Sequence, residues 1–281
     1  MKVVVGIDIG GSTTKIAGFK DDKMIKPVQI SANTPLASLF GGFGKFLYDN
    51  KLELEDIKQV NLTGVGSSGI DKPIYGLPTY FVDEFTANGV GGGYFAKDID
   101  EFMVVSMGTG TSYVGVKDGI PSHLGGIGIG GGTINGLSKY ILGFNDIDKV
   151  RELALKGDIK KIDLTIGDIS TVAIQGLDTD ITASNFGKSS SSASLEDKAQ
   201  GIVHMVIEDI CQTAALIAQG SNIKNFVLIG ALTKFTYECE RATNMVKKIF
   251  PGIEFIIPNI GEYGTSIGAA LAKKCELKDI K

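Results

Sequence analysis

Cysteine and proline are scarce in this sequence, and the cysteines lie far apart. The three of them, Cys211, Cys239 and Cys275, form no Cys-x-x-Cys pair and no cysteine–histidine spacing that would hold zinc or an iron–sulfur cluster. An odd, sparse set of cysteines is typical of a reducing cytosol rather than of a secreted disulfide scaffold. With only 7 prolines, the chain also falls outside the proline- and glycine-rich composition of low-complexity segments.

Long uncharged apolar runs are missing as well. The opening residues, MKVVVGIDIGG, contain only a short apolar run with no small-residue cleavage site after it, so we expect no signal peptide. The longest apolar stretch, 201–220, carries His204, Glu208 and Asp209, which favours a buried or amphipathic helix over a membrane span. The sequence therefore predicts a cytoplasmic protein without a membrane partner, and a structural role for His204.

Glycine, by contrast, is abundant. The chain has 38 glycines in 281 residues, about twice the usual share, without the three-residue period of collagen. A hydrophobic content of 43% and a net charge of −4 argue against disorder and against a broad nucleic-acid face. Between Gly89 and Gly136 lie 15 of the 38 glycines. Because glycine weakens regular elements by ~0.5–1 kcal/mol each, this concentration favours loops whose backbone approaches a ligand.

Two segments share a strand–turn–strand pattern. Residues 3–19 place Gly10-Gly11-Ser12 between two β-branched, apolar stretches, and residues 102–119 place Gly108 to Ser112 in the same position. We interpret this as a weak internal repeat, with two ordinary hairpins as the alternative. It predicts two domains, 1–100 and 101–281, with the last helix able to pack back on the first domain.

The remaining pattern alternates helices and strands. Six glycines within residues 125–132 predict an irregular loop that feeds a helix near Thr133. The serine-rich tract 188–194 is predicted to be an exposed loop. Further helices are predicted at 36–50, from Thr86, at 147–156, at 196–219 and after the loop around Gly264. Residues 59–69 are predicted to be a buried strand that runs into a glycine-rich turn, and further strands are predicted at 78–82 and 224–230.

Glycine-rich turns suggest phosphate binding, because bare backbone N–H groups can approach an anion closely. A P-loop is excluded at Gly187-Lys188-Ser189, because Thr182 stands where its first glycine is required. The G-x-G-x-x-G run from Gly126 to Gly131 follows the turn-like KDGIPSHL instead of a strand, which disfavours a dinucleotide site.

The phosphate turns carry a family resemblance. GIDIGGSTTK (6–15) resembles the first phosphate motif of the sugar kinase, hexokinase and actin superfamily. The chain further resembles bacterial type II pantothenate kinases in a series of segments with similar order and spacing. These are VDEFTA (82–87), MGTGTS (107–112), GGIGIGGGTINGL (125–137), GDIKKIDLTIGDI (157–169), DITASNFG (180–187), VLIGA (227–231) and GEYGTSIGA (261–269).

The resemblance covers nearly the whole chain and implies a fold and an activity. The implied fold is a two-domain α/β actin-like ATPase, with duplicated ribonuclease H-like halves and a nucleotide cleft between them. The implied activity is ATP-dependent phosphorylation of the primary hydroxyl of pantothenate to 4′-phosphopantothenate, the first step of coenzyme A biosynthesis. A homodimer is implied as well.

The resemblance also implies roles for individual residues. Asp8 would hold Mg²⁺ and Glu84 would be the general base, with Asp83 as its rival; in isolation, Asp8 could equally be a turn residue and Glu84 a helix N-terminal carboxylate. Glu84, Thr109, Ser112 and His123 would face the acceptor. The residues implied to contact ATP are Gly10, Gly11, Ser12, Thr13, Lys15, Gly108, Thr109, Gly110, Thr111, Gly130, Gly131, Gly132, Thr133, Asn135, Gly230 and Ala231.

The sequence departs from the family at His123. The family usually has an arginine there, which contacts the pantothenate carboxylate, and neutral histidine supplies neither its permanent charge nor its bidentate fork. Three explanations stay open: another cation serves the carboxylate, His123 is protonated in the complex, or the acceptor is a neutral relative such as pantetheine. Other open functions are an amino-sugar kinase, an ATPase that activates 2-hydroxyacyl-CoA dehydratases, and a nucleotide sensor.

Overall fold

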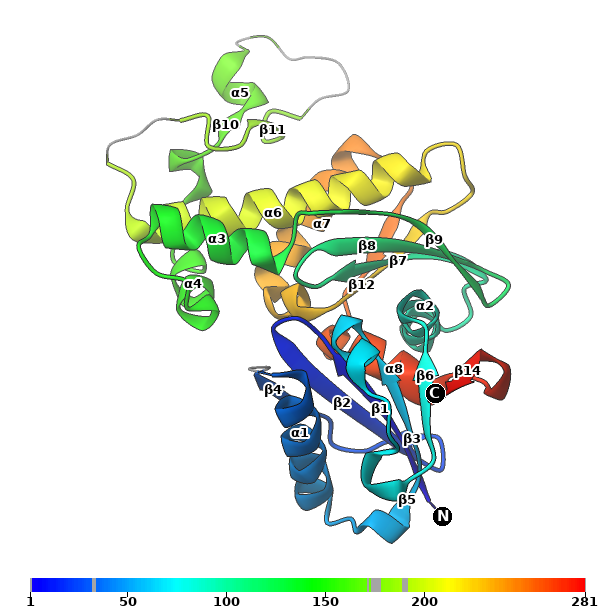
Figure 1. Ribbon diagram of the computed structural model, residues 1–281. Coiled ribbons are helices and arrows are strands. Elements are labelled where there is room, and N and C mark those ends of the chain that lie inside the picture. Colours follow the sequence, from blue (N-terminus) through cyan, green and yellow to red (C-terminus); the bar gives the residue numbers. More distant parts are fainter. Residues whose placement is uncertain (1, 32–33, 171, 173–177, 189–191, 281) are drawn as a thin grey trace.

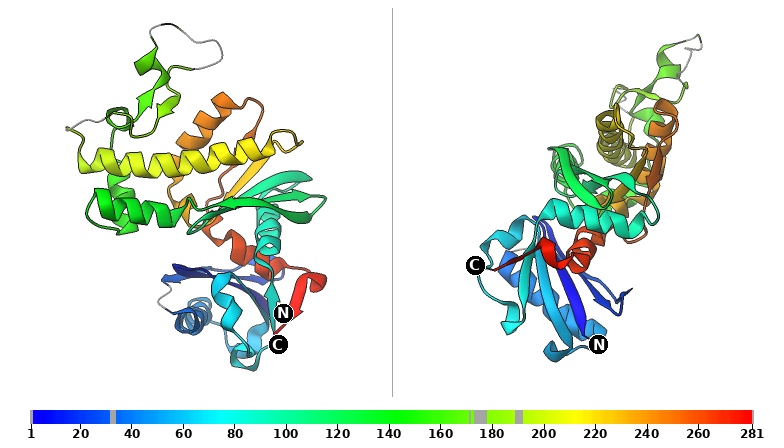
Figure 2. Two further views of the ribbon diagram at one scale, coloured as in Figure 1. Left: turned by 45° about the horizontal axis from the view of Figure 1, so that its top comes forward. Right: turned by 90° about the vertical axis from the view of Figure 1, so that its right-hand side faces the viewer.

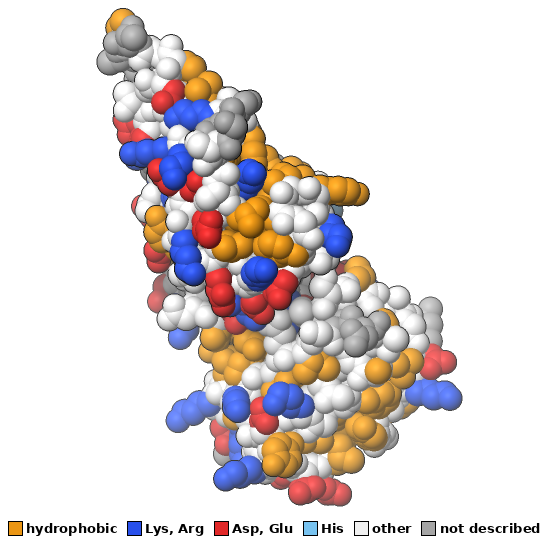
Figure 3. Space-filling model, turned by 90° about the vertical axis from the view of Figure 1, so that its left-hand side faces the viewer, with side chains coloured by type: hydrophobic (Ala, Val, Ile, Leu, Met, Phe, Trp, Pro, Cys, Tyr) orange, Lys and Arg blue, Asp and Glu red, His pale blue; other side chains and the backbone are white. Residues whose placement is uncertain are grey.

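The computed structural model describes residues 2–31, 34–170, 172, 178–188 and 192–280. The chain forms two lobes, one from the N-terminal strands and one from the middle of the sequence (Figures 1 and 2). In the space-filling view the lobes meet at a narrower waist (Figure 3).

The first lobe is built on a seven-stranded sheet with a hairpin at its centre. β1 pairs antiparallel with β2 and parallel with β5, which pairs parallel with β6. Helix α1 (Pro35–Asn50) packs Leu39, Phe43 and Phe46 into the core from one side of the helix. The strands are β1 (Val3–Ile9), β2 (Thr13–Lys20), β3 (Lys23–Met24), β4 (Val28–Ser31), β5 (Ile57–Thr63), β6 (Thr79–Val82) and β14 (Leu277–Asp279).

The second lobe repeats this topology in a five-stranded sheet. β7 pairs antiparallel with β8, and on its other side β12 is parallel to both β7 and β13. Each sheet thus places a hairpin beside two parallel strands, which agrees with the internal repeat seen in the sequence. The strands are β7 (Glu101–Met107), β8 (Thr111–Lys117), β9 (Ile120–Ile127), β12 (Asn225–Ile229) and β13 (Glu254–Ile256).

Four helices cover the second sheet on the side of its main core. α6 (Leu195–Ala218) runs through that core and packs with α3 (Gly131–Ile141), α4 (Ile147–Ala154) and α7 (Thr236–Ile249) (Figure 1). Among the described residues, α6 is the one helix with the length and apolar composition to cross a membrane, and 67% of its most apolar window is buried inside the protein. This burial is that of a core helix, as the sequence predicts.

Two helices lie between the sheets and touch through glycines. On α2 (Glu84–Phe95), a Cβ atom at Gly91 would lie 2.0 Å from the carbonyl oxygen of Gly264, at the start of α8 (Gly264–Leu271). On α8, a Cβ atom at Gly268 would lie 1.8 Å from Ala87 O. The helices can approach this closely only because both positions lack a side chain.

α8 also contacts the first sheet. A Cβ atom at Gly6 on β1 would lie 2.1 Å from Ser266 O, and β14, which follows α8, pairs with β6. The chain thus returns to the first lobe at its C-terminal end (Figure 1). The division into domains 1–100 and 101–281, which falls next to the start of β7, stays a proposal.

The structure corrects three expectations from the sequence. Gly89, Gly91 and Gly92 lie in α2, so part of the glycine concentration serves helix packing and not a ligand loop. Residues 120–127 form strand β9 instead of a turn and loop, because even a glycine-rich edge strand can pair its backbone with β8. Helix α2 starts at Glu84, two residues before Thr86, since Asp83 caps it.

The other expected helices and strands are confirmed within a few residues. A small excursion between α4 and α6 contains β10 (Leu164–Thr165), α5 (Ile166–Ile169) and β11 (Thr182–Ser184). Within the serine-rich tract, residues 189–191 lie outside the described part of the chain. The short 3₁₀ helices are Leu54–Asp56, Val65–Gly69, Ile74–Gly76, Ile159–Lys161, Ala231–Lys234, Gly261–Tyr263 and Lys274–Glu276.

Candidate active site

The two hairpin turns face each other across a cleft. The β1–β2 turn carries Gly11 and the β7–β8 turn carries Thr109, and a Cβ atom at Gly11 would lie 3.4 Å from Thr109 Oγ1. The cleft between them has a volume of about 620 Å³. Two turns that are 98 residues apart in sequence therefore form opposite walls of one site.

Most of the predicted site residues line this cleft. Three do not: Gly130 caps α3, Thr133 lies in the first turn of α3, and His123 lies on β9. The predicted residues that line it are Asp8, Gly10, Gly11, Ser12, Thr13, Lys15, Glu84, Gly108, Thr109, Gly110, Thr111, Ser112, Gly131, Gly132, Asn135, Gly230 and Ala231.

Asp8 and Lys15 form an ion pair at the edge of the first turn. They are opposite each other on β1 and β2, with Asp8 Oδ2 3.8 Å from Lys15 Nζ, and both are nearly buried. Burial raises the pKa of Asp8, and the charge of Lys15 offsets part of this rise. Gly64 has φ +85, and a Cβ atom there would lie 2.5 Å from Asp8 Oδ1. A side chain at residue 64 would therefore crowd the carboxylate.

Glu84 and its neighbour Asp83 have different surroundings. Asp83 caps α2, and its Oδ1 accepts hydrogen bonds from the backbone N–H groups of Phe85 (3.0 Å) and Thr86 (3.1 Å). Glu84 is the first residue of the helix and lines the cleft, which Asp83 does not. Burial raises the pKa of Glu84, the charges of Asp8 and Asp83 raise it further, and Lys15 lowers it.

The glycine loop after β9 is bonded to the second turn. The N–H of Gly131 donates to Gly108 O (2.8 Å), and the N–H of Gly132 donates to Thr109 O (2.9 Å). A Cβ atom at Gly130 would lie 2.6 Å from Thr109 O, so the loop can lie this close only as glycine. These bonds place the N-terminus of α3 at the wall of the cleft.

Two hydroxyl groups on either side of this loop donate to its carbonyl oxygens. Thr111 Oγ1 donates to Ile129 O (2.8 Å), and Thr133 Oγ1 donates to Gly128 O and accepts from the N–H of Gly130. Asn135 Oδ1, in contrast, is buried at the cleft without a hydrogen-bond partner among the described residues.

Gly230 follows β12 beside the second hairpin. It has φ +95, and a Cβ atom there would lie 2.5 Å from Met107 O. The backbone is therefore free to turn sharply into the 3₁₀ helix Ala231–Lys234, which lines the cleft on its second-lobe side.

His123 lies outside the cleft lining and stacks on the residue after Glu84. The rings of His123 and Phe85 are 4.0 Å apart between centroids and inclined by 20°. His123 therefore packs at the start of α2, against the residue that follows Glu84.

Several cleft residues were missed by the sequence reading. Gly64 and Thr265 stand in segments that the sequence singles out, and a closer reading of the Leu-Thr-Gly-Val-Gly run could have found the first. Gly126 and Ile127 lie in the glycine-rich segment 125–137, of which the sequence reading assigned only residues from Gly130 onward to the site. The remaining residues reach the cleft from separate elements and show no local signal. The missed residues are Gln29, Ser31, Gly64, Val65, Ser106, Gly126, Ile127, Ile147, Asp148, Arg151, Leu232, Lys234, Phe235 and Thr265.

The DITASNFG segment takes no part in lining the cleft. Thr182 Oγ1 donates to Glu208 Oε2 (3.1 Å), and the N–H of Phe186 donates to Asp163 Oδ1 (2.8 Å). The first bond ties the excursion between α4 and α6 to α6, and the second bond lies within the excursion.

Similar solved structures define the class of this protein. The activator of the 2-hydroxyisocaproyl-CoA dehydratase from Clostridium difficile with bound ADPNP matches 96% of this chain and 93% of its own, with a TM-score of 0.69 and 19% identity. A ROK family glucokinase from Streptomyces griseus in complex with glucose and AMPPNP matches 95% and 98%, with a TM-score of 0.61 and 12% identity. The fold is that of the actin-like ATPases and sugar kinases, as the sequence predicts.

Sequence comparison then gives the family. A family model described as Fumble matches residues 94–266. A type II pantothenate kinase of Bacillus cereus (strain G9842) is 30% identical over 249 residues, which are 82% of this chain and 84% of that protein. Another from Bacillus cereus (strain ATCC 10987) is 29% identical over 289 residues, 96% of this chain and 98% of that protein. The chain belongs to the Fumble family, whose members include these type II pantothenate kinases.

Proposed function

We propose that this protein is a pantothenate kinase, which transfers the γ-phosphoryl group of ATP to the primary hydroxyl of pantothenate. The observation that carries the proposal is that Asp8 and Glu84 line one cleft between two glycine-rich turns. Phosphoryl transfer requires positioned reactants, charge neutralisation and a proton acceptor. The cleft contains side chains suited to each of these tasks.

The first and second turns would hold the phosphates of ATP. Backbone N–H groups of the turns and the ammonium of Lys15 supply donors and positive charge where the phosphates lie. Gly230 and Ala231 would flank the adenosine end of the nucleotide, beyond the second turn.

Asp8 fits a magnesium ion. Mg²⁺ is usually bound by one or two carboxylates together with substrate phosphates and water. Asp8 supplies one nearly buried carboxylate at the cleft, and no group of three histidine, cysteine or acidic residues in the described ranges forms a closed metal cage. When bound, the ion would neutralise charge on the phosphates.

Glu84 would act as the general base. Its carboxylate would take the proton of the primary alcohol while that oxygen bonds to the γ-phosphorus, and the bond from this phosphorus to the β–γ bridging oxygen breaks to release ADP. Asp83 is the poorer candidate, because its carboxylate is engaged with the backbone of α2. Thr109, on the second turn, and Ser112, near the start of β8, would contact the acceptor or the transferring group.

Pantothenate is the acceptor that we propose, although His123 stands at the family's arginine position. A release assay for ADP with pantothenate, pantetheine and N-acetylglucosamine tests this assignment. We expect turnover of pantothenate with a raised KM, because the guanidinium group is missing. Turnover of another alcohol without turnover of pantothenate would contradict pantothenate as the acceptor.

A dehydratase activator is disfavoured by the cysteines. Cys211 and Cys239 are buried in the core of the second lobe, where burial raises the pKa of both thiols, and only Cys275 is exposed. An iron–sulfur absorption band in the purified protein would favour that alternative. A nucleotide sensor would need no general base for an acceptor. Turnover that is lost in a Glu84 variant would therefore favour the kinase over the sensor.

We further propose a cytoplasmic homodimer, as the family resemblance implies. Light scattering on the purified protein measures its mass, and a monomer across the working concentration range would contradict the dimer.

A further inference from the structure

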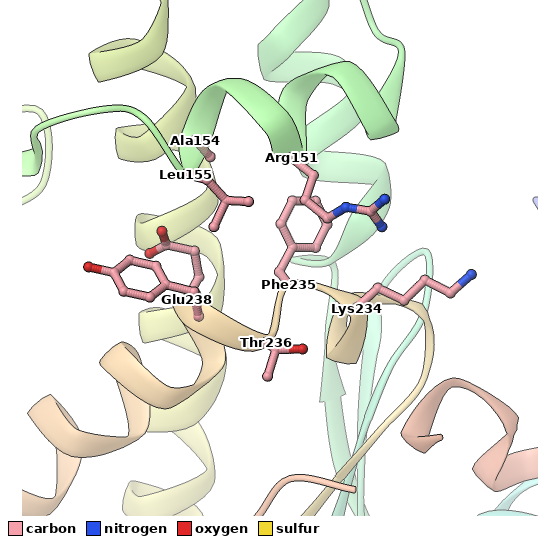
Figure 4. A pocket seen from close by; sticks show the side chains of 8 residues that line it. Arg151, Ala154, Leu155, Lys234, Phe235, Thr236 and Glu238 are labelled. Atoms are coloured by element: carbon pink, nitrogen blue, oxygen red, sulfur yellow. The ribbon is translucent and has the colours of Figure 1, made fainter. Parts of the chain in front are cut away.

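The surroundings of Glu84 differ from those of the second-lobe side of the cleft. On that side, Arg151, Lys234 and Phe235 line the cleft and also a smaller pocket of about 300 Å³ between α4 and the start of α7 (Figure 4). Glu84 does not line this pocket and stands at the start of α2, between the two sheets. The groups that can direct its carboxylate therefore belong to α2 and to the elements packed against α2.

Asn88 follows Glu84 by four residues on α2. Side chains with this spacing lie on one face of a helix, with their Cβ atoms about 5–6 Å apart. Because the Cα–Cβ bonds of a helix tilt toward its N-terminus, the side chain of Asn88 leans toward the turn that carries Glu84. Asn88 is completely buried, whereas Glu84 lines the cleft. The two residues thus form an inner and an outer position on the same helix face.

The amide oxygen of Asn88 is held by hydroxyl groups from two other elements. Thr265 Oγ1, on α8, donates to Asn88 Oδ1 at 2.8 Å, and Ser106 Oγ, near the end of β7, donates to the same oxygen at 3.5 Å. Both hydroxyl residues line the cleft. Because the amide group is planar, the bonds to its oxygen also restrict the position of its nitrogen.

The amide nitrogen of Asn88, in contrast, is an unpaired donor. Asn88 Nδ2 is buried and has no hydrogen-bond acceptor among the described residues. A buried donor without a partner is costly and rare in native proteins. The Glu84 carboxylate has the opposite deficiency, because no group in the described part of the chain donates a hydrogen bond to it. An unpaired donor and an unpaired acceptor therefore stand one turn apart on one face of α2.

The charges around Glu84 make such a donor useful. Asp8 on β1 and Asp83 at the cap of α2 disfavour the ionised carboxylate, as burial does, and Lys15 on β2 favours it. A general base has to be ionised before it can take a proton. A neutral N–H group that donates to one carboxylate oxygen stabilises the ionised form and leaves the other oxygen for the alcohol.

We propose that Asn88 is a positioning residue for the base: its amide N–H donates to one carboxylate oxygen of Glu84 and directs the other oxygen toward the acceptor alcohol. Thr265 fixes the amide, so rotation of the Glu84 side chain is enough to close the bond. The inference rests on the proposed function, because it gives Asn88 this part only where Glu84 is the base.

Carbon-13 NMR of protein labelled at its glutamate carboxyl carbons measures the pKa of Glu84 without requiring turnover. The resonance of Glu84 is the one that is missing from Glu84→Gln. We expect Asn88→Ala to raise the pKa of Glu84 by about one unit, because the ionised form loses a hydrogen bond. The midpoint of kcat/KM against pH should rise by the same amount, while the KM for ATP stays within about twofold.

Asn61→Ala is the matched control. Asn61, on β5, is also completely buried, and its Nδ2 donates to Ala269 O of α8 at 2.7 Å. The substitution therefore removes a buried amide that contacts the same helix, α8, from the first sheet instead of from α2. It should lower the stability of the protein and leave the pKa of Glu84 unaltered. A merely structural role for Asn88 predicts this same result for Asn88→Ala.

Each outcome decides the inference. An unchanged pKa of Glu84 in folded Asn88→Ala, or an equal rise in Asn61→Ala, would overturn it. If Asn88→Ala does not fold, Asn88→Leu takes its place, because leucine has a similar size and no N–H group; an unchanged pKa there would overturn the inference as well. Turnover of pantothenate without the pKa shift defeats the inference alone. The pKa shift without turnover of any alcohol supports the contact between Asn88 and Glu84 and defeats the proposed kinase.

Discussion

Lys234 and Gln29 are joined by a hydrogen bond across the cleft. Lys234 Nζ donates to Gln29 Oε1 at 2.6 Å, although the two residues are 205 positions apart. Gln29 lies on β4 of the first lobe and Lys234 on the 3₁₀ helix after β12 of the second, and both line the cleft. The bond therefore ties the two lobes together at the rim of the candidate active site.

Removing this bond should weaken nucleotide binding by favouring an open cleft. We expect Lys234→Met and Gln29→Leu each to raise the KM for ATP a few-fold, because an exposed hydrogen bond contributes about 0.5–1.5 kcal/mol. Steady-state kinetics on both single variants and the double variant measure the coupling. The KM for ATP of the double variant should be little higher than that of either single variant. Strictly additive effects on the binding free energy would show that the two residues act separately.

Glu84→Gln should abolish most turnover. The amide keeps the size of the side chain but cannot accept the alcohol proton, so we expect kcat to fall by about 10²–10⁴ while ATP affinity stays within a few-fold. Asp83→Asn is the matched control, because asparagine also caps helices well. Near-normal kcat in Glu84→Gln, or an equal loss in Asp83→Asn, would contradict the base assignment.

The raised pKa of Glu84 predicts opposite pH effects on activity and stability. Activity requires the ionised carboxylate, so kcat/KM should rise with pH with a midpoint above the ordinary 4.5 of a glutamate. The folded protein holds this proton more tightly than the unfolded chain, so Glu84 lowers stability as pH rises through its folded-state pKa.

Thermal unfolding across pH measures this effect. Glu84→Gln should melt above the wild-type protein at pH 8, and the difference should disappear below about pH 4, where Glu84 is protonated in both states. A variant that melts below the wild type at pH 8 would contradict a raised pKa.

Asp8→Asn should change the metal dependence of the reaction. The amide is a weaker ligand for Mg²⁺ than the carboxylate, so we expect a higher Mg²⁺ concentration for half-maximal rate and a lower kcat. Titration of Mg²⁺ at fixed ATP measures both quantities, and an unaltered titration curve argues against a metal role for Asp8.

Gly6→Ala should destabilise the protein by at least about 2 kcal/mol. The added methyl group would lie 2.1 Å from Ser266 O and force α8 away from β1. Gly41→Ala is the control, because a Cβ atom there meets no atom within 4 Å and α1 gains helix propensity of about 0.5–1 kcal/mol. Denaturant unfolding distinguishes the two, and equal stability of both variants would refute the close α8–β1 contact.

The sequence by itself predicted the two hairpins and most of the helices, because their signals are local. The apolar strands on either side of Gly10-Gly11-Ser12 and of Gly108 to Ser112 are visible as short patterns, and so are helices 36–50 and 196–219. Strand β9 was not predicted, because its glycines give no strand-like pattern of side chains. Its pairing with β8 is made by backbone groups.

The sequence alone did not distinguish Asp83 from Glu84 as the candidate base. Asp83 and Glu84 are adjacent acidic residues, and only family resemblance favoured one of them in the sequence. The structure separates them, since the cap of α2 engages Asp83 and leaves Glu84 at the cleft.

The sequence determined that Gly10-Gly11-Ser12 and Gly108-Thr109-Gly110 stand in turns, because a turn needs only neighbouring residues. The tertiary structure alone decided which of these turns meet, and that Gln29 and Lys234 come together at the cleft. Those residues come from separate elements, and their proximity arises only when α2 and α8 pack through their glycines and bring the two sheets together.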